Sequence, residues 1–172
     1  MKRKFLIIHH LPEERWKEYK ALRIKAVKVD PLAFGLTEAE ELKKSDKEWK
    51  HRLKSDASVQ MIFVESEGTL VGMIGLFKET LEKIRHLSKI LSFFVDPQYR
   101  GNDIGKLLLE EVITCLKADK EVKKITLSVT TTQKSAIGLY KKYGFKITGV
   151  LHEELCWKKD YYDQYLMEYV FN

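Results

Sequence analysis

The sequence contains only three prolines and nine glycines among its 172 residues. This is too little for a collagen-like protein or a flexible linker, and no internal repeat or low-complexity segment divides the chain. Hydrophobic residues make up 44% and charged residues 33%, the balance of a folded globular protein. Because a typical domain takes about 100 to 150 residues, a second one would have no room for its own core. We therefore expect a single domain over residues 1–172.

Long hydrophobic runs are also absent. The longest are a few residues, such as residues 5–8, whereas a membrane-spanning helix needs about 20. The same run is shorter than the roughly 7 to 15 apolar residues of a secretory signal, although basic residues precede it. We therefore expect no membrane partner and interpret residues 5–8 as the first strand of a mature cytoplasmic protein.

Cysteine is scarce as well. The two cysteines, Cys115 and Cys156, have neither CxxC spacing nor a neighbouring pair of histidines. This spacing excludes a disulfide framework and indicates no zinc site. We expect two neutral thiols in a reducing compartment and no metal cofactor.

Blocks of one charge are missing, although the net charge is +6 and the pI is about 9.1. Such a charge favours anionic ligands by long-range attraction. The basic residues come as pairs and one triplet separated by acids, without a helix-turn-helix signature or an aromatic RNA-binding motif. A solvated surface of mixed charge explains this pattern, and nucleic acid is disfavoured as a partner.

Hydrophobic periodicity predicts an α/β fold with a mixed sheet. We expect strands at residues 5–8, 59–65, 69–77, 89–95, 124–130, 146–151 and 165–171. Helices are predicted from Pro12 to Val29, over residues 104–118 and over residues 133–143. Two capping boxes, beginning at Thr37 and Ser45, predict two further short helices.

The turn from the strand at residues 89–95 into the next helix carries the first chemical signal. Gly101 and Gly105 bracket a helix N-terminus, where free backbone N–H groups and the helix dipole attract phosphate or pyrophosphate. The spacing is not that of a P-loop, and a Rossmann fingerprint lacks its first glycine pair. By itself, the turn is equally typical of a tight connection into a capped helix.

A second motif follows downstream, and the two together resemble the GNAT superfamily of N-acetyltransferases over nearly the whole chain. The family's Val-x-Pro strand end matches Val95-Asp96-Pro97. Its Arg/Gln-x-x-Gly-x-Gly/Ala turn matches at Arg100 and Gly105, with Asp103 replacing the middle glycine. Its Asn-x-x-Ala-x-x-x-Tyr-x-x-x-Gly-Phe helix end matches at Ala136, Tyr140, Gly144 and Phe145, with Gln133 replacing asparagine.

The resemblance implies a GNAT-like α/β fold, with a mostly antiparallel central sheet flanked by helices and splayed between the strands at 89–95 and 124–130. It implies acetyl-CoA as co-substrate, with its pyrophosphate on the amides of residues 101–106 and its pantetheine arm paired with strand 93–95. The candidate cofactor-binding residues are Phe93, Phe94, Val95, Arg100, Gly101, Asn102, Asp103, Ile104, Gly105, Lys106, Gln133 and Ala136.

The implied activity is acetyl transfer to a primary amine by direct attack in a ternary complex. Tyr140 is the candidate acid that protonates the departing thiolate, since a free thiol has a pKa of about 8.5; ordinary core packing of this tyrosine is the alternative. The general base is not readable, because Lys89 stands where the family often carries a carboxylate. Possible substitutes are Glu79, Glu153, Glu154, His86 and His152.

Two departures from the family pattern leave a second interpretation open. Asp103 places a carboxylate near the expected pyrophosphate, unless it serves as a first-turn residue that favours the helix dipole. Gln133 is one methylene longer than the family's asparagine. A catalytically silent CoA-binding or regulatory module is therefore the alternative. The acceptor, a small-molecule or a peptide or protein amine, and a homodimeric state both stay open.

Overall fold

The computed structural model describes residues 4–54 and 58–171, and within them the strands form one seven-stranded sheet. The strands are β1 (Leu6–Ile8), β2 (Val59–Ser66), β3 (Thr69–Lys78), β4 (Leu87–Val95), β5 (Lys124–Thr130), β6 (Lys146–Trp157) and β7 (Asp160–Val170). Their order across the sheet is β1-β2-β3-β4-β5-β7-β6. Every neighbouring pair is antiparallel except β4 and β5, which are parallel. This confirms the predicted mixed, mostly antiparallel sheet.

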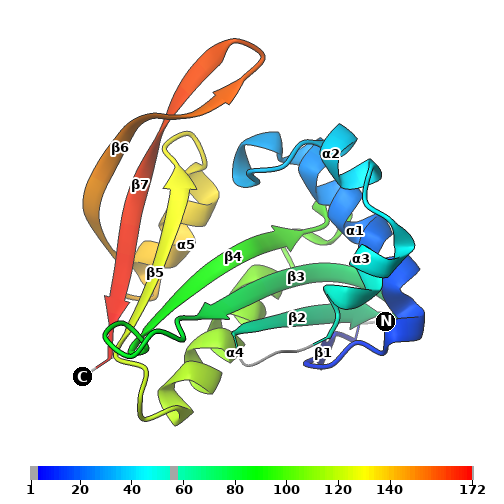
Figure 1. Cartoon of the computed structure of the whole chain (residues 1–172), viewed down its shortest axis with the longest axis horizontal. Helices are drawn as coiled ribbons and strands as arrows, with labels where there is room; N and C mark the ends of the chain where they lie inside the picture. Colours follow the sequence, from blue (N-terminus) through cyan, green and yellow to red (C-terminus); the bar gives the residue numbers. More distant parts are fainter. Residues whose placement is uncertain (1–3, 55–57, 172) are drawn as a thin grey trace.

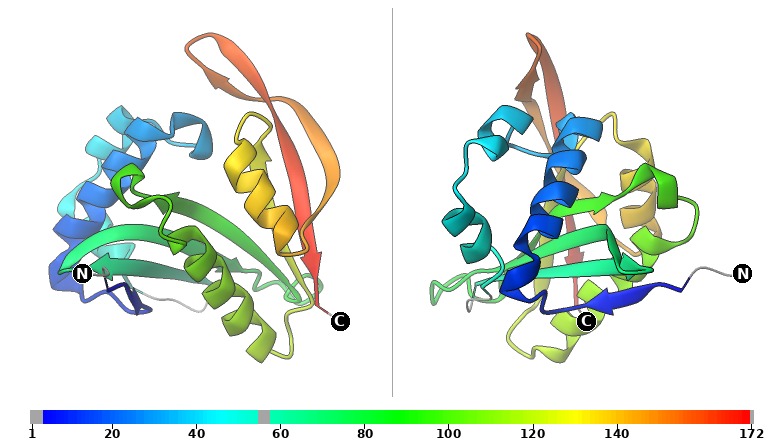
Figure 2. Two further views of the ribbon diagram at one scale, coloured as in Figure 1. Left: turned by 180° about the vertical axis from the view of Figure 1, so that it is seen from behind. Right: turned by 90° about the vertical axis from the view of Figure 1, so that its right-hand side faces the viewer.

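Helices cover both faces of this sheet. They are α1 (Trp16–Val29), α2 (Glu38–Leu42), α3 (Asp46–His51), α4 (Ile104–Ala118) and α5 (Lys134–Lys142). Helices α1 to α3 gather on one face of the β1–β4 half, α4 crosses the other face, and α5 lies against the β5–β7 half (Figures 1 and 2). A helix is stabilised by burying an apolar stripe against another element, so the fold has a core on each side of the sheet. One core includes Leu108 and Ile137, and the other includes Tyr19 and Trp49.

Several elements form where the sequence predicts them. Helix α4 and strand β5 begin and end at the predicted residues. Both predicted capping boxes form. The hydroxyl groups of Thr37 and Ser45 accept from the backbone N–H groups of Glu40 and Glu48, and the carboxylates of these glutamates accept from the backbone N–H groups of Thr37 and Ser45. None of the described helices is both long and apolar enough to cross a lipid bilayer.

The last two strands are much longer than predicted. The sequence predicts strands at residues 146–151 and 165–171, separated by a loop. In the structure, β6 and β7 extend through most of that segment and form one long hairpin. It projects beyond the rest of the sheet (Figure 1). Most of β6 is exposed or half-buried along its length, so no alternation of apolar and polar residues marks it in the sequence.

The feature that positions the site is the divergence of β4 and β5. These two strands pair only between Leu87–Lys89 and Lys124–Thr126. Beyond Lys89, β4 contains an irregularity at Ser92, whose φ of 55° lies in the left-handed region. Strands β5 to β7 then turn away from β4 (Figure 1). The predicted splay is therefore confirmed.

Candidate functional site

The diverging strands open onto a cleft of about 820 Å³ between the end of β4 and the first turns of α4 and α5. The lining includes all predicted cofactor-binding residues except Asn102 and Lys106; these are Phe93, Phe94, Val95, Arg100, Gly101, Asp103, Ile104, Gly105, Gln133 and Ala136. The Asn102 amide instead donates to the carbonyl oxygen of Tyr99 at 2.9 Å. The Lys106 ammonium lies 3.9 Å from Glu110.

The N-terminus of α4 presents hydrogen-bond donors at this cleft. The first amides of any helix have no carbonyl partner within the helix. Asp103 occupies the N-cap position, yet its side chain makes no capping bond. Its φ is 58°, so it does not act as the first-turn residue that the sequence suggested. The uncapped amides and the helix dipole make this end of α4 suited to an anion.

Gly105 lies in the first turn of α4 and lines the cleft. A β-carbon at this position would lie 3.4 Å from Leu139 Cδ2 and 3.6 Å from the Phe93 ring. Gly105, Leu139 and Phe93 all line the cleft. A larger side chain would therefore fill the space between α4, α5 and β4.

Arg100 joins the two sides of the cleft mouth. Its Nε donates to the carbonyl oxygen of Val95 at 3.0 Å, and its Nη2 donates to Asp30 at 2.5 Å. Asp30 directly follows α1, so this ion pair connects the end of α1 to the end of β4. Further back, the edge of β4 beyond Lys89 lacks a strand partner on the β5 side, and an extended ligand can pair with it.

A smaller chamber of about 320 Å³ adjoins the cleft, because Phe93, Gln133 and Ala136 line both. Tyr140 also lines this chamber and is only 5% exposed. Its ring centroid lies 5.9 Å from that of Phe93 and 5.6 Å from that of Phe145.

The Tyr140 hydroxyl has no hydrogen-bond partner among the described residues. Burial raises the pKa of Tyr140 well above its ordinary value. The hydroxyl is therefore protonated at neutral pH and is a free donor beside the chamber.

Of the expected substitutes for the missing base, only Glu154 lines the chamber. Glu79 is paired with Lys89 at 2.6 Å, near the paired end of β4 and β5. His152 Nδ1 lies 3.1 Å from Asp163, whose other oxygen accepts from the amide of Glu153. His86 is exposed in the loop before β4.

A buried charge network contacts the chamber wall at Ser92, and no local sequence pattern predicts it. The guanidinium of Arg23 donates to Glu41 at 2.8 Å and to the Ser92 hydroxyl at 2.9 Å. Arg52 donates to the other oxygen of Glu41 at 2.8 Å. Glu41 is fully buried. These residues lie far apart in the chain, so only the three-dimensional packing of α1, α2 and β4 reveals the pairing.

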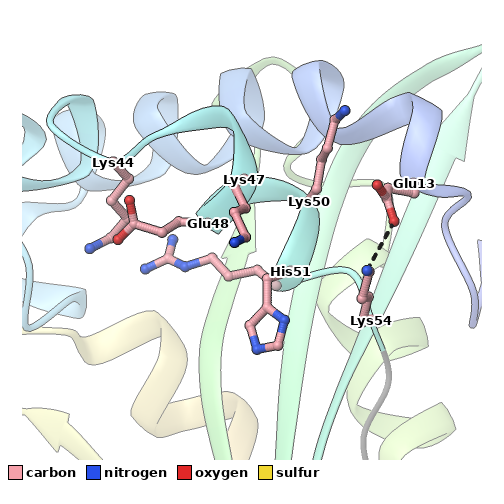
Figure 3. A pocket seen from close by; sticks show the side chains of 8 residues that line it. Glu13, Lys44, Lys47, Glu48, Lys50, His51 and Lys54 are labelled. Atoms are coloured by element: carbon pink, nitrogen blue, oxygen red, sulfur yellow. Dashed lines mark ion pairs between the residues drawn. The ribbon is translucent and has the colours of Figure 1, made fainter.

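A second large concavity, of about 670 Å³, lies around α3 (Figure 3). Charged side chains line it, among them Lys44, Lys47, Lys50 and His51. Glu13 and Lys54 form an ion pair across 3.6 Å on its rim. Because none of its lining residues lines the cleft or the chamber at the splay, we do not assign the chemistry to it.

Comparison with known proteins identifies the family of this fold and site. The sequence matches the acetyltransferase (GNAT) family over residues 16–145, and the chain belongs to that family. The Streptococcus pneumoniae acetyltransferase of the GNAT family has the same fold, with a TM-score of 0.87 at 22% identity, covering 98% of this chain and 100% of that one.

Two curated relatives from Bacillus subtilis are acetyltransferases by name. A putative [ribosomal protein bS18]-alanine N-acetyltransferase is 26% identical over 65% of this chain and 66% of its own length. A spermine/spermidine N(1)-acetyltransferase is 39% identical over 49% of this chain and 58% of its own length. The matched part thus spans less than two thirds of each of these relatives.

Proposed function

We propose that this chain is an acetyl-CoA-dependent N-acetyltransferase that acts on a primary amine. The observation that carries the proposal is the junction of two spaces: the cleft at the N-terminus of α4 meets the chamber beside Tyr140 at Phe93, Gln133 and Ala136. A transfer reaction needs two substrates to meet at one point. We further propose that one domain performs the whole reaction in the cytoplasm.

The residues of the cleft fit acetyl-CoA as co-substrate. The uncapped amides of the first turn of α4 would hold the diphosphate. Gly101 lies in the loop before this turn, and Gly105 lies within it. The unpaired edge of β4 would hold the pantetheine arm by main-chain hydrogen bonds. This arrangement delivers the thioester, whose carbonyl carbon the amine attacks, to the junction beside Phe93.

Tyr140 would act as the general acid. Its side chain is only 5% exposed and lines the chamber next to Phe93, and its hydroxyl is protonated at neutral pH. When the new C–N bond forms and the C–S bond breaks, this proton can pass to the departing thiolate. A backbone N–H of β4 would stabilise the oxyanion that forms on the way.

Glu154 would receive the amine. Its carboxylate lines the chamber, where its negative charge would attract an ammonium group. The same carboxylate could accept a proton from the amine through a water molecule. One relative is named for spermine and spermidine, and another is named as a putative acetyltransferase of a ribosomal-protein alanine. Both acceptor classes therefore belong in the test.

The deciding experiment measures release of CoA thiol when acetyl-CoA is mixed with a panel of polyamines, amino acids and peptides bearing free α-amines or lysines. We expect amine-dependent thiol release with at least one class. Binding of acetyl-CoA is measured separately by calorimetry. Binding without thiol release on any amine would favour the catalytically silent module, and absence of both would reject the cofactor site.

A further inference from the structure

Three side chains able to bind a metal ion converge beside α4, two to three turns along the helix from Gly105. His9 Nε2 lies 3.1 Å from Glu111 Oε1. The thiol of Cys115 donates to the same carboxylate oxygen at 3.5 Å. All three potential ligand atoms lie within 4.8 Å of one another, and each residue is half-buried. None of them lines the acetyl-transfer cleft or the chamber.

Local geometry explains why these residues meet. Glu111 and Cys115 are four positions apart in α4, which places them on the same helix face. His9 directly follows β1, whose Ile8 pairs with Phe63 of β2. Because α4 packs on β2 and β3, the end of β1 arrives next to that face of the helix. Sequence spacing cannot reveal the cluster, since His9 lies far along the chain from Glu111 and Cys115.

The ligand set selects the kind of metal. A thiolate, an imidazole and a carboxylate are together typical of Zn²⁺, whereas Ca²⁺ and Mg²⁺ require oxygen ligands. In a tetrahedral zinc site with ordinary bond lengths, neighbouring ligand atoms are about 3.4 to 3.6 Å apart. The contacts of Glu111 with His9 and Cys115, at 3.1 and 3.5 Å, are close to that spacing.

We propose that His9, Glu111 and Cys115 form a Zn²⁺-binding site, with water as the fourth ligand. Cys115 also lines a pocket of about 230 Å³ together with Gln60 and Asp119, and neither His9 nor Glu111 lines this pocket. Binding releases the thiol proton to solvent, because the thiolate is the ligand. The site is separate from acetyl transfer and does not depend on that function.

The bound ion would fix the first strand to the helix. Strand β1 is three residues long and, among the strands in the described part of the chain, pairs with β2 alone. An ion bound by His9 on one side and by Glu111 and Cys115 on the other would join the end of β1 to α4. Since an ion bound to the folded state alone stabilises it by mass action, the melting temperature should rise with the zinc concentration.

The test uses the untagged, reduced, metal-free protein. Titration with Co²⁺ should produce the thiolate-to-cobalt charge-transfer absorption, and calorimetry with Zn²⁺ should show one site. Cys115→Ser should abolish the cobalt band, and His9→Gln should weaken Zn²⁺ binding by more than about tenfold. Cys156→Ser is the matched control, because Cys156 is the exposed thiol on β6 and should leave the band unchanged.

Each outcome is decisive. His9 lies half-exposed at a strand end, so His9→Gln tests the site even where Cys115→Ser disturbs the helix. Equal Zn²⁺ affinity in the parent and both variants, absence of a cobalt band, or loss of the band in Cys156→Ser would overturn the proposal and leave a hydrogen-bonded cluster. Thiol release from acetyl-CoA is not a readout here, so failure of the site and failure of the enzyme assignment are distinguishable.

Discussion

Arg23 on α1 donates a hydrogen bond to the hydroxyl of Ser92 at 2.9 Å, and Ser92 is the left-handed residue in β4 where the chamber opens. The same guanidinium is bound to the buried Glu41 of α2. This one side chain of α1 therefore contacts both α2 and the irregularity in the central strand. Ser92 lines the chamber, whereas Arg23, Glu41 and Arg52 do not, so the charge network contacts the chamber wall from outside.

Removing Arg23 should be costly for stability. Arg23→Met leaves the fully buried Glu41 with only Arg52 as a partner, and breaking a buried ion pair typically destabilises by about 3 to 5 kcal/mol. Urea denaturation measures the loss. Arg15→Met is the control, since Arg15 pairs with Glu18 and Glu65 near the surface and its loss should cost about 1 kcal/mol or less. Equal effects of the two substitutions would contradict a structural role for the buried network.

Asp103→Gly should stabilise the protein and leave acetyl-CoA affinity unchanged or tighter. Asp103 has a φ of 58° without a capping bond, and glycine adopts that conformation without the steric cost of a side chain. The gain should be about 1 kcal/mol, seen as a higher melting temperature. Calorimetry measures the affinity for acetyl-CoA, which should not fall because the substitution removes a negative charge near an anionic ligand.

Asp103→Asn separates these two effects. It removes the charge but keeps a side chain that tolerates the left-handed region. If Asp103→Gly lowers both stability and affinity, the carboxylate supports the turn and our interpretation is wrong.

The sequence predicted the central part of this site better than its surroundings. Helix α4 was predicted to the residue because Leu108, Val112 and Leu116 form one apolar stripe that is buried in the structure. The turn at residues 100–106 was predicted as a candidate cofactor site because glycines and a helix start are local signals. The resemblance to a known family then supplied the roles of these residues.

Long-range features were not predictable in the same way. The β6–β7 hairpin is exposed along most of β6, so its sequence carries no burial pattern. The contact of Arg23 with Ser92 joins residues that no local rule relates, and it forms only because α1 packs beside β4. The selection of Glu154 from five candidate bases likewise required knowing which side chain lines the chamber.

Gly105→Glu should abolish acetyl-CoA binding. A β-carbon there already lies 3.4 Å from Leu139, so the longer side chain must occupy the cleft, where its charge repels a diphosphate. Gly138→Glu is the matched control, because Gly138 is exposed on α5 and a β-carbon there meets nothing within 4 Å. Calorimetry with acetyl-CoA and circular dichroism test binding and folding separately. Parental affinity in a folded Gly105→Glu variant would place the diphosphate elsewhere.

Tyr140→Phe should lower turnover by about 100- to 10,000-fold while acetyl-CoA binding changes little. The hydroxyl acts only as the thiolate leaves, whereas the ring keeps its contacts with Phe93 and Phe145. Tyr143→Phe is the control on the same helix, since its hydroxyl donates to Glu110 at 2.6 Å, outside the chamber. Steady-state kinetics on the amine identified by the panel gives the comparison. Turnover within twofold of the parent would leave Tyr140 as a core residue.

The burial of Tyr140 also predicts how stability depends on alkaline pH. Because burial raises the pKa of Tyr140 in the folded state, only the unfolded chain loses this proton just above pH 10. The Tyr140 proton therefore contributes fully to the free energy of unfolding below that pH. This contribution falls by about 1.4 kcal/mol per pH unit as the pH rises toward the folded-state pKa. Tyr140→Phe has no such proton, so urea denaturation between pH 9 and pH 11 should show a steeper loss in the parent than in the variant. Parallel losses would show that the Tyr140 hydroxyl is solvated in the folded state and that burial does not raise its pKa.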